Sequence, residues 1–105
     1  MAQFDAHRNT NAASSRRYPL LLDIQSNLLD DLATRVVVPL AVLDERSAPP
    51  ITRLMPVFEI EGRRLAMHTA QLASIGRKSL GPRVASLANQ REDIVAALDV
   101  LISGV

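Results

Sequence analysis

The fold is limited first by residues 35–43, RVVVPLAVL, in which Arg35 is followed by an uninterrupted apolar run. The run is rich in β-branched side chains, which favour extended backbone, and it has the length of a strand. We therefore predict a buried strand here. Pro39 lies inside the run and has no backbone N–H for a sheet, so we expect a bulge or a bend at that residue.

Other segments carry further strand signals. Residues 18–24, YPLLLDI, are strongly aliphatic, with a proline near their start that suits the beginning of a strand. Toward the end of residues 55–61 polar and apolar side chains alternate, as they do in a strand whose two faces have different surroundings. Gly62-Arg63 then predicts a tight hairpin turn, and residues 64–70 predict the returning strand.

The intervening segments are typical of connections. Residues 5–17 are polar and small with no regular period, so we expect a loop after a short first strand that ends at Phe4. Residues 25–34 are rich in Asn, Asp and Ser and predict a long turn. Residues 44–50 predict a loop, because the two prolines at their end disfavour helix before them.

The clearest periodicity lies at the C-terminal end of the chain. Apolar side chains recur every three or four residues along residues 82–102, which predicts one amphipathic helix. Pro82 suits the first helical position, and Gly104 suits the position just after a helix. We therefore expect one domain over residues 1–105, mainly β, with strands within residues 1–80 and one long C-terminal helix.

Composition excludes several classes of protein. Twelve basic against eleven acidic residues give a net charge of +1, which excludes a nucleic-acid binder that works by bulk charge. The sequence contains no cysteine, so disulfides, thiolate nucleophiles and cysteine-ligated metals are excluded. No apolar run approaches the roughly 20 residues that span a bilayer. We expect a cytoplasmic protein with no membrane partner.

The candidate catalytic residues form no recognisable set. His7 is expected in the first loop and His68 on an edge strand, and neither has a partner at the spacing of a zinc-binding helix. Glu59 and Glu61 share a strand face that two arginines of the returning strand oppose, where ion pairing is favoured over acid–base catalysis. No serine is flanked by the glycines of a nucleophile elbow. We expect no enzyme, no metal site and no cofactor.

Two surface features leave alternatives open. Residues 76–79, GRKS, lack the glycines of a phosphate-binding loop. With Arg83 they make a small basic cluster at the predicted helix start, where a solvated face is favoured over an anion site. Ile102, Gly104 and Val105 are apolar or small at the C-terminus, so this tail either folds back on the sheet or forms a partner-binding edge.

Residues 18–40, YPLLLDIQSNLLDDLATRVVVPL, resemble the CcdB family of toxin proteins. The shared pattern is an aromatic residue, an apolar strand ending in Asp-Ile-Gln-Ser, two leucines and an aspartate, then Arg35 and apolar residues before Pro39. The resemblance extends over nearly the whole chain. Further matching pieces are Gln3-Phe4, Pro56-Val57, Ile60, Ala73-Ser74 and residues 91–93.

The resemblance implies a small SH3-like β-barrel with a long C-terminal helix, assembled as a homodimer. Members of the family poison DNA gyrase: they bind its A subunit and hold the enzyme on cleaved DNA. A cognate antitoxin of the CcdA type neutralises the toxin and represses the operon together with it. Operator DNA is bound only through the antitoxin, and the toxin performs no covalent chemistry.

The resemblance also implies where gyrase binds, namely the loop after Asp-Ile-Gln-Ser and the last turn of the helix. Carried over by position, the gyrase-binding residues are Ser26, Asn27, Leu28, Leu29, Asp99, Ile102, Ser103, Gly104 and Val105. A dimer would place two helix ends side by side, so exposed apolar tips would form a symmetric wedge.

This sequence departs from the family pattern at three positions. Ser103 stands where the best-known members have tryptophan, so stacking of that ring on a gyrase arginine is lost. Asp99 replaces an amide and adds a charge near the helix tip. Gly76 replaces a proline, which loosens its loop.

Two alternative functions stay open. Some SH3-like barrel toxins are ribonucleases, in which case Arg63, Arg64, Arg77 and His68 are the candidates for phosphate binding and acid–base work. That hypothesis leaves the two leucines and the tail without a role. The other alternative is a regulatory dimer without toxicity.

Overall fold

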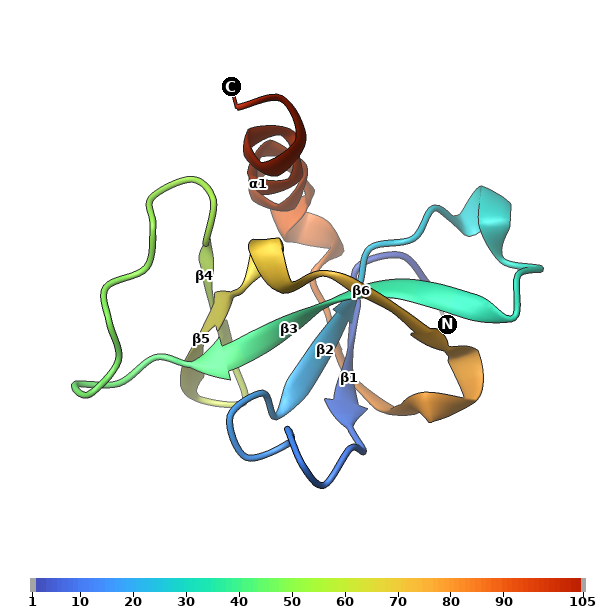
Figure 1. Ribbon diagram of the computed structural model, residues 1–105, viewed down its shortest axis with the longest axis horizontal. Helices are drawn as coiled ribbons and strands as arrows, with labels where there is room; N and C mark the ends of the chain where they lie inside the picture. Colours follow the sequence, from blue (N-terminus) through green and yellow to red (C-terminus); the bar gives the residue numbers. More distant parts are fainter. Residues whose placement is uncertain (1, 105) are drawn as a thin grey trace.

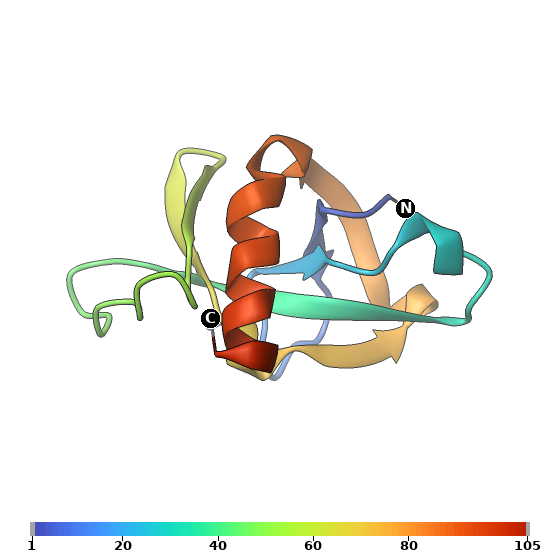
Figure 2. The same cartoon turned by 90° about the horizontal axis from the view of Figure 1, so that it is seen from above.

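A curled antiparallel sheet and one helix make up the structure, a computed structural model that describes residues 2–104 (Figure 1). Within those residues the sheet order is β4-β5-β3-β2-β1-β7, and β6 pairs separately with β3. The helix α1 lies across one side of this half-barrel (Figure 2). The expected mainly β fold with a C-terminal helix is confirmed. The elements are β1 (Asp5–Asn9), β2 (Leu20–Asp23), β3 (Thr34–Val42), β4 (Val57–Ile60), β5 (Arg63–Met67), β6 (Ala73–Gly76), β7 (Leu80–Ser86) and α1 (Arg91–Ser103).

The predicted central run forms β3, and its proline marks a change of partner. The pairing of β3 with β2 continues through Leu21 opposite Pro39 without a shift, so the predicted bulge is absent from this pairing. On its other edge β3 pairs with β6 through Val37 and with β5 from Leu40 onward. The missing N–H of Pro39 therefore falls between two partner strands, where the sheet needs no donor.

The prediction of a loop over residues 5–17 is wrong in its first part, because residues 5–9 form β1. These residues are mostly polar, but contacts with residues distant in the sequence stabilise them within the sheet. Asp5 forms an ion pair with Arg83 (3.2 Å), and the ring Nδ1 of buried His7 is 2.9 Å from the carbonyl oxygen of Gly81. Local sequence carries no sign of either contact, so tertiary pairing overrides the local pattern.

The hairpin of β4 and β5 is confirmed, with its turn one residue earlier than predicted. Glu61 and Gly62 both have positive φ (54° and 75°), as the two central residues of a type I′ turn require. Glu59 lies opposite Arg64 in the register, as expected. Glu61, however, forms its ion pair with Arg8 of β1 (2.9 Å) and not with the returning strand.

The C-terminal helix is shorter than the predicted 82–102, because residues 80–86 form β7 and α1 begins at Arg91. A side chain at Gly81 would come within 2.7 Å of the Arg8 carbonyl oxygen, so this glycine permits close pairing with β1. Pro82, the next residue, therefore lies in β7 and not at the start of the helix. The predicted stop is confirmed, since Gly104 has φ of 73° and donates its N–H to the Val100 carbonyl oxygen (3.0 Å).

The core lies between the concave face of the sheet and α1, and its side chains are mostly aliphatic. Ile94 and Ala97 are the fully buried residues that fix α1 on this core. Burial of such side chains contributes most of the stability of a small domain. Among the described residues no helix is long and apolar enough to cross a membrane. The buried cluster comprises Phe4, Ala6, Leu20, Leu22, Val38, Leu40, Phe58, Ile60, Leu65, Met67, Leu87, Ile94 and Ala97.

Candidate partner-binding site

The loop at residues 24–33, which we name the partner-binding loop after its predicted role, presents apolar side chains to solvent from an ordered turn. Residues Asn27–Leu29 form a short 3-10 turn, and the Ser26 hydroxyl caps it by accepting the N–H of Leu28 (3.2 Å). The side chain of Leu28 is 94% exposed, and that of Leu29 is half exposed. With Leu32, which is also half exposed, these leucines form an apolar cluster of the kind that a partner can cover.

Gln25 connects this loop to β3 through two hydrogen bonds of its side chain. Its side-chain amide donates to the carbonyl oxygen of Leu29 (2.9 Å), while its side-chain oxygen accepts the N–H of Val36 (3.0 Å). One buried side chain therefore spans the loop and the neighbouring strand. The conformation of the loop is thus linked to β3, an interior strand of the sheet.

A buried ion pair forms the base of the partner-binding loop. The Arg35 guanidinium donates twice to one oxygen of Asp23 (3.0 and 2.6 Å), and both side chains are fully buried. Arg35 also reaches Asp30 near the end of the loop (2.9 Å). Such a pair is costly to break, because the remaining charge is left buried without a partner. The ion pair was not predicted from the sequence, although an arginine at the start of an apolar run is a visible signal.

The helix tip, residues 99–104, contains Asp99, Ile102, Ser103 and Gly104, which belong to the second predicted part of the site. Ile102 is 79% exposed, and nothing lies within 4 Å of the position where a side chain at Gly104 would begin. The Ser103 hydroxyl donates to the carbonyl oxygen of Asp99 (2.8 Å), so it is engaged within the helix itself. Val105 lies outside the described residues. The helix tip is therefore open to contact from outside.

A single chain does not bring the loop and the helix tip together. In Figures 1 and 2 the turn at residues 27–29 and the C-terminal end of α1 lie well apart. The residues predicted as one site are thus two separate exposed patches in one protomer.

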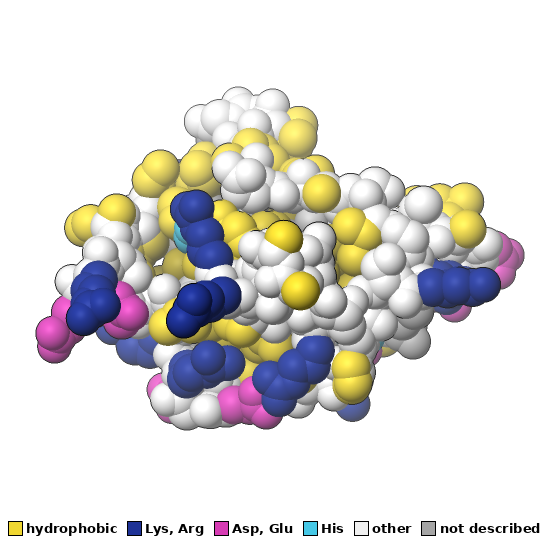
Figure 3. All heavy atoms as spheres, turned by 60° about the horizontal axis from the view of Figure 1, so that its bottom comes forward, with side chains coloured by type: hydrophobic (Ala, Val, Ile, Leu, Met, Phe, Trp, Pro, Cys, Tyr) yellow, Lys and Arg dark blue, Asp and Glu magenta, His cyan; other side chains and the backbone are white. Residues whose placement is uncertain are grey.

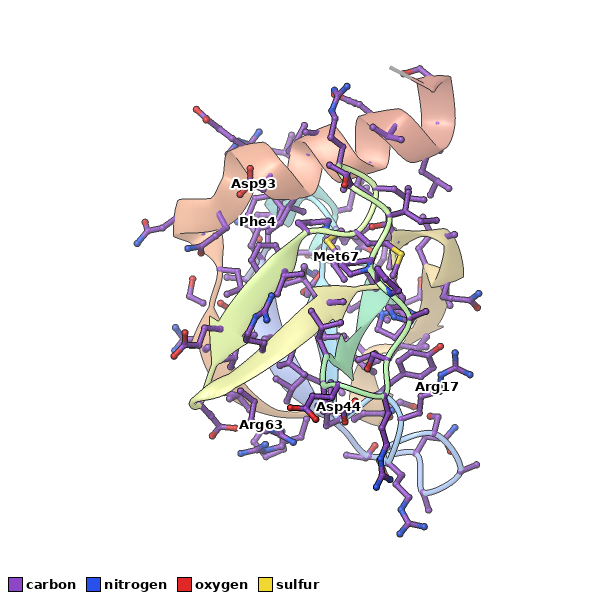
Figure 4. The ribbon with its side chains drawn as sticks, turned by 90° about the vertical axis from the view of Figure 1, so that its left-hand side faces the viewer. Phe4, Arg17, Asp44, Arg63, Met67 and Asp93 are labelled. Carbon is purple, nitrogen blue, oxygen red and sulfur yellow. The ribbon has the colours of Figure 1, made fainter. Side chains whose placement is uncertain are left out.

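A basic groove of about 620 Å³ lies elsewhere, between the loop at residues 10–18 and the loop after β3. Arg16 and Arg17 flank it, and its floor is aliphatic. No carboxylate within residues 2–104 forms an ion pair with either arginine. Figure 3 shows Lys and Arg side chains gathered over an apolar surface, and Figure 4 shows Arg17 and Asp44 at the same end of the molecule. The floor and rim include Ala41, Leu43, Asp44, Ala48, Pro49, Ile51, Met55, Ala66 and His68.

The imidazole of His68 lines the same groove. Partial burial of the ring, together with the nearby charge of Arg17, lowers the pKa of His68 below its ordinary value. The ring packs edge-on against Tyr18, with 5.4 Å between ring centroids. The guanidinium of Arg17 lies over the tyrosine ring at 5.1 Å. The groove therefore combines the positive charge of its two arginines with a mainly apolar surface and one carboxylate, that of Asp44.

The four residues of the ribonuclease hypothesis do not lie together in the structure. Arg63 and Arg64 begin β5, whereas His68 follows its other end. Arg77 belongs to a different turn and forms an ion pair with Asp30 (3.4 Å).

The predicted basic cluster at a helix start is also wrong. Residues Arg77–Ser79 form a 3-10 turn that leads into a strand, and Arg77 and Arg83 each have a carboxylate partner. Within residues 2–104 no group of three or more acidic or histidine side chains is placed to hold a metal ion.

Comparison with known proteins shows which family of proteins has this fold. A curled sheet of this topology is similar to that of a solved structure described as an endoribonuclease in complex with its cognate antitoxin from mycobacterial species. The TM-score is 0.75 over 95% of this chain and 92% of the other, at 13% identity, which shows a shared fold. A family model described as CcdB protein matches residues 3–104, and the chain belongs to the CcdB family. Membership places it among the toxins of toxin–antitoxin pairs and confirms the resemblance seen in the sequence.

Proposed function

We propose that this protein is a poison of DNA gyrase that binds the A subunit and traps the enzyme on cleaved DNA. The observation that carries the proposal is the 94% exposed Leu28, held on an ordered turn at the position that the family resemblance assigns to gyrase binding. Covering an exposed leucine with a partner removes apolar surface from water, which favours association. The open helix tip gives a second contact of the same kind.

A homodimer is part of the proposal, because the loop and the helix tip lie apart in one chain. A second copy related by a two-fold axis would present each patch twice on one assembly, which permits a loop and a tip from different protomers to act together. The oligomeric state in solution, measured by light scattering, tests this step. A monomer at the concentrations of the gyrase assay would contradict it.

We further propose that the antitoxin docks an acidic and apolar arm in the basic groove. The solved structure of similar fold contains a cognate antitoxin, and the groove here offers two arginines beside an aliphatic floor. Carboxylates would meet Arg16 and Arg17, while aliphatic side chains would cover Ile51 and Met55. Repression of the operon then follows through the antitoxin, which supplies the contacts to operator DNA.

The decisive experiment is a gyrase cleavage assay with purified protein, supercoiled plasmid, ATP and the gyrase of the host. We expect linear DNA after detergent and protease, and we expect it to disappear when residues 103–105 are deleted. A folded dimer that yields no linear DNA would contradict the proposal. RNA loss in expressing cells without a DNA-damage response would then favour the ribonuclease alternative, and the absence of both effects would favour the regulatory one.

A further inference from the structure

Arg77 connects the turn after β6 to the partner-binding loop. Its Nη1 donates to the main-chain oxygen of Asp30 (2.9 Å), and its Nη2 lies 3.4 Å from the Asp30 carboxylate. Its own backbone N–H donates to the carbonyl oxygen of Ala33 (2.9 Å). Arg77 therefore holds the C-terminal end of the loop through both its side chain and its main chain.

The same aspartate is held from beneath by Arg35, whose Nη1 is 2.9 Å from the Asp30 carboxylate. Two guanidinium groups thus converge on Asp30, one fully buried and one at the surface with a third of its side chain exposed. Charge-assisted hydrogen bonds of this kind are directional, so they fix where Asp30 lies. Leu28 and Leu29 immediately precede this fixed point.

We propose that Arg77 is a positioning residue that holds the partner-binding loop in the one conformation that presents Leu28 and Leu29. The inference rests on the proposed function for the identity of the partner, while the ordering of the loop can be measured without it. A loop that is ordered before binding loses less conformational entropy when the partner covers it. Arg77 therefore acts on affinity without touching the partner.

The matched pair of variants is Arg77→Met and Lys78→Met. Each removes one positive charge from the same turn, but Lys78 forms no ion pair within residues 2–104. We expect Arg77→Met to bind gyrase about tenfold more weakly, as the loss of one charge-assisted contact implies, and Lys78→Met to bind within about twofold of the wild type. Arg77→Lys should recover part of the affinity, because it restores a charge near Asp30 but not the planar fork.

Amide hydrogen exchange by NMR measures the positioning itself. The N–H groups of Leu29, Asp30 and Leu32 are hydrogen-bonded within the loop. They should exchange about tenfold faster in Arg77→Met and at the wild-type rate in Lys78→Met, with the thermal midpoint of both variants near that of the wild type.

Three results would overturn the proposal: unchanged exchange of these amides in Arg77→Met, acceleration spread over the whole sheet, or equal effects of the two methionine variants. If the wild type itself fails to bind gyrase, the proposed function fails. The exchange rates still decide whether Arg77 orders the loop.

Discussion

The loops on either side of β2 use their charges in opposite ways. Asp30 of the partner-binding loop, residues 24–33, forms ion pairs with two arginines from outside the loop, Arg35 and Arg77, and Arg35 also pairs with Asp23 of β2. The leucines of this loop face solvent. In the loop at residues 10–18, Arg16 and Arg17 face solvent beside an aliphatic groove.

The difference indicates two kinds of partner surface on one small domain. A loop that ion pairs hold in one conformation can offer its apolar side chains for contact. Such a surface suits a partner that is recognised by shape complementarity. A groove with unpaired cations attracts acidic groups over a distance and depends on ionic strength. This contrast is why we assign gyrase to the first surface and the antitoxin arm to the second.

The largest effect is expected from breaking the charged base of the partner-binding loop. Arg35→Met leaves the Asp23 carboxylate buried without its partner, so the free energy of unfolding should fall by about 3–5 kcal/mol. Urea denaturation measures it. Arg8→Met removes an exposed pair with Glu61 and should cost less than about 1 kcal/mol. Equal losses in the two variants would show that burial does not distinguish the two ion pairs.

Loss of toxicity without loss of fold is expected from the helix tip. Gly104→Glu places a charged side chain at an open, positive-φ position, so binding to gyrase should fall by about 100-fold and growth inhibition should disappear. Gly104→Asn is the control, because asparagine tolerates this backbone conformation without adding a charge. A toxic Gly104→Glu protein, or one that no longer folds, would remove the tip from the proposed site.

The leucines of the partner-binding loop should contribute to binding and little to stability. Leu28→Asp should weaken gyrase binding by about 30-fold, while the thermal midpoint moves by less than about 2 °C because this side chain is exposed. Leu32→Asp, in the same loop but outside the predicted contacts, should bind nearly as the wild type does. Surface plasmon resonance with immobilised gyrase A subunit compares the two. Similar losses would point to charge near the loop rather than to contact by Leu28.

A smaller effect, on the other partner, is expected from the groove. Arg17→Ser should weaken binding of the antitoxin encoded beside the gene by about fivefold at low salt, and less at high salt because ions screen the attraction. Gyrase cleavage should be unchanged. Arg63→Ser, which removes the same charge at the β4–β5 hairpin, is the control for net charge. Equal weakening by the two variants would contradict docking in the groove.

The sequence predicted the elements whose signals are local. The run of residues 35–43, the hairpin after Ile60 and the stop at Gly104 all depend on propensities that act within a few residues, and each is found close to its predicted place. β1 and β7 were missed for the opposite reason. Asp5 becomes buried through Arg83, some eighty positions away in the chain, and no local pattern reports such a contact.

The candidate site was predictable only in part. The exposed residues at 26–29 and 99–104 came from the family resemblance, and their exposure agrees with a binding role. The frame beneath them was not predicted, because Gln25, Arg35 and Arg77 act through contacts that only the folded chain brings together. Arg77 in particular had been a candidate for phosphate binding, whereas its guanidinium is engaged with Asp30.

The smallest expected effect is a pH dependence of the free energy of unfolding that arises from His68 in the basic groove. Burial lowers the pKa of His68 below its usual 6.5, so the unfolded chain binds this proton more readily than the folded one. Stability is therefore complete above about pH 6.5 and should decline as the pH falls through that value toward the lower folded pKa. Urea denaturation at about pH 7.5 and 5.5 measures the difference, which His68→Gln should reduce. Arg17→Ser should reduce it as well, because the arginine charge contributes to the lowered pKa. A decline that is unchanged in both variants would show that His68 is not its source.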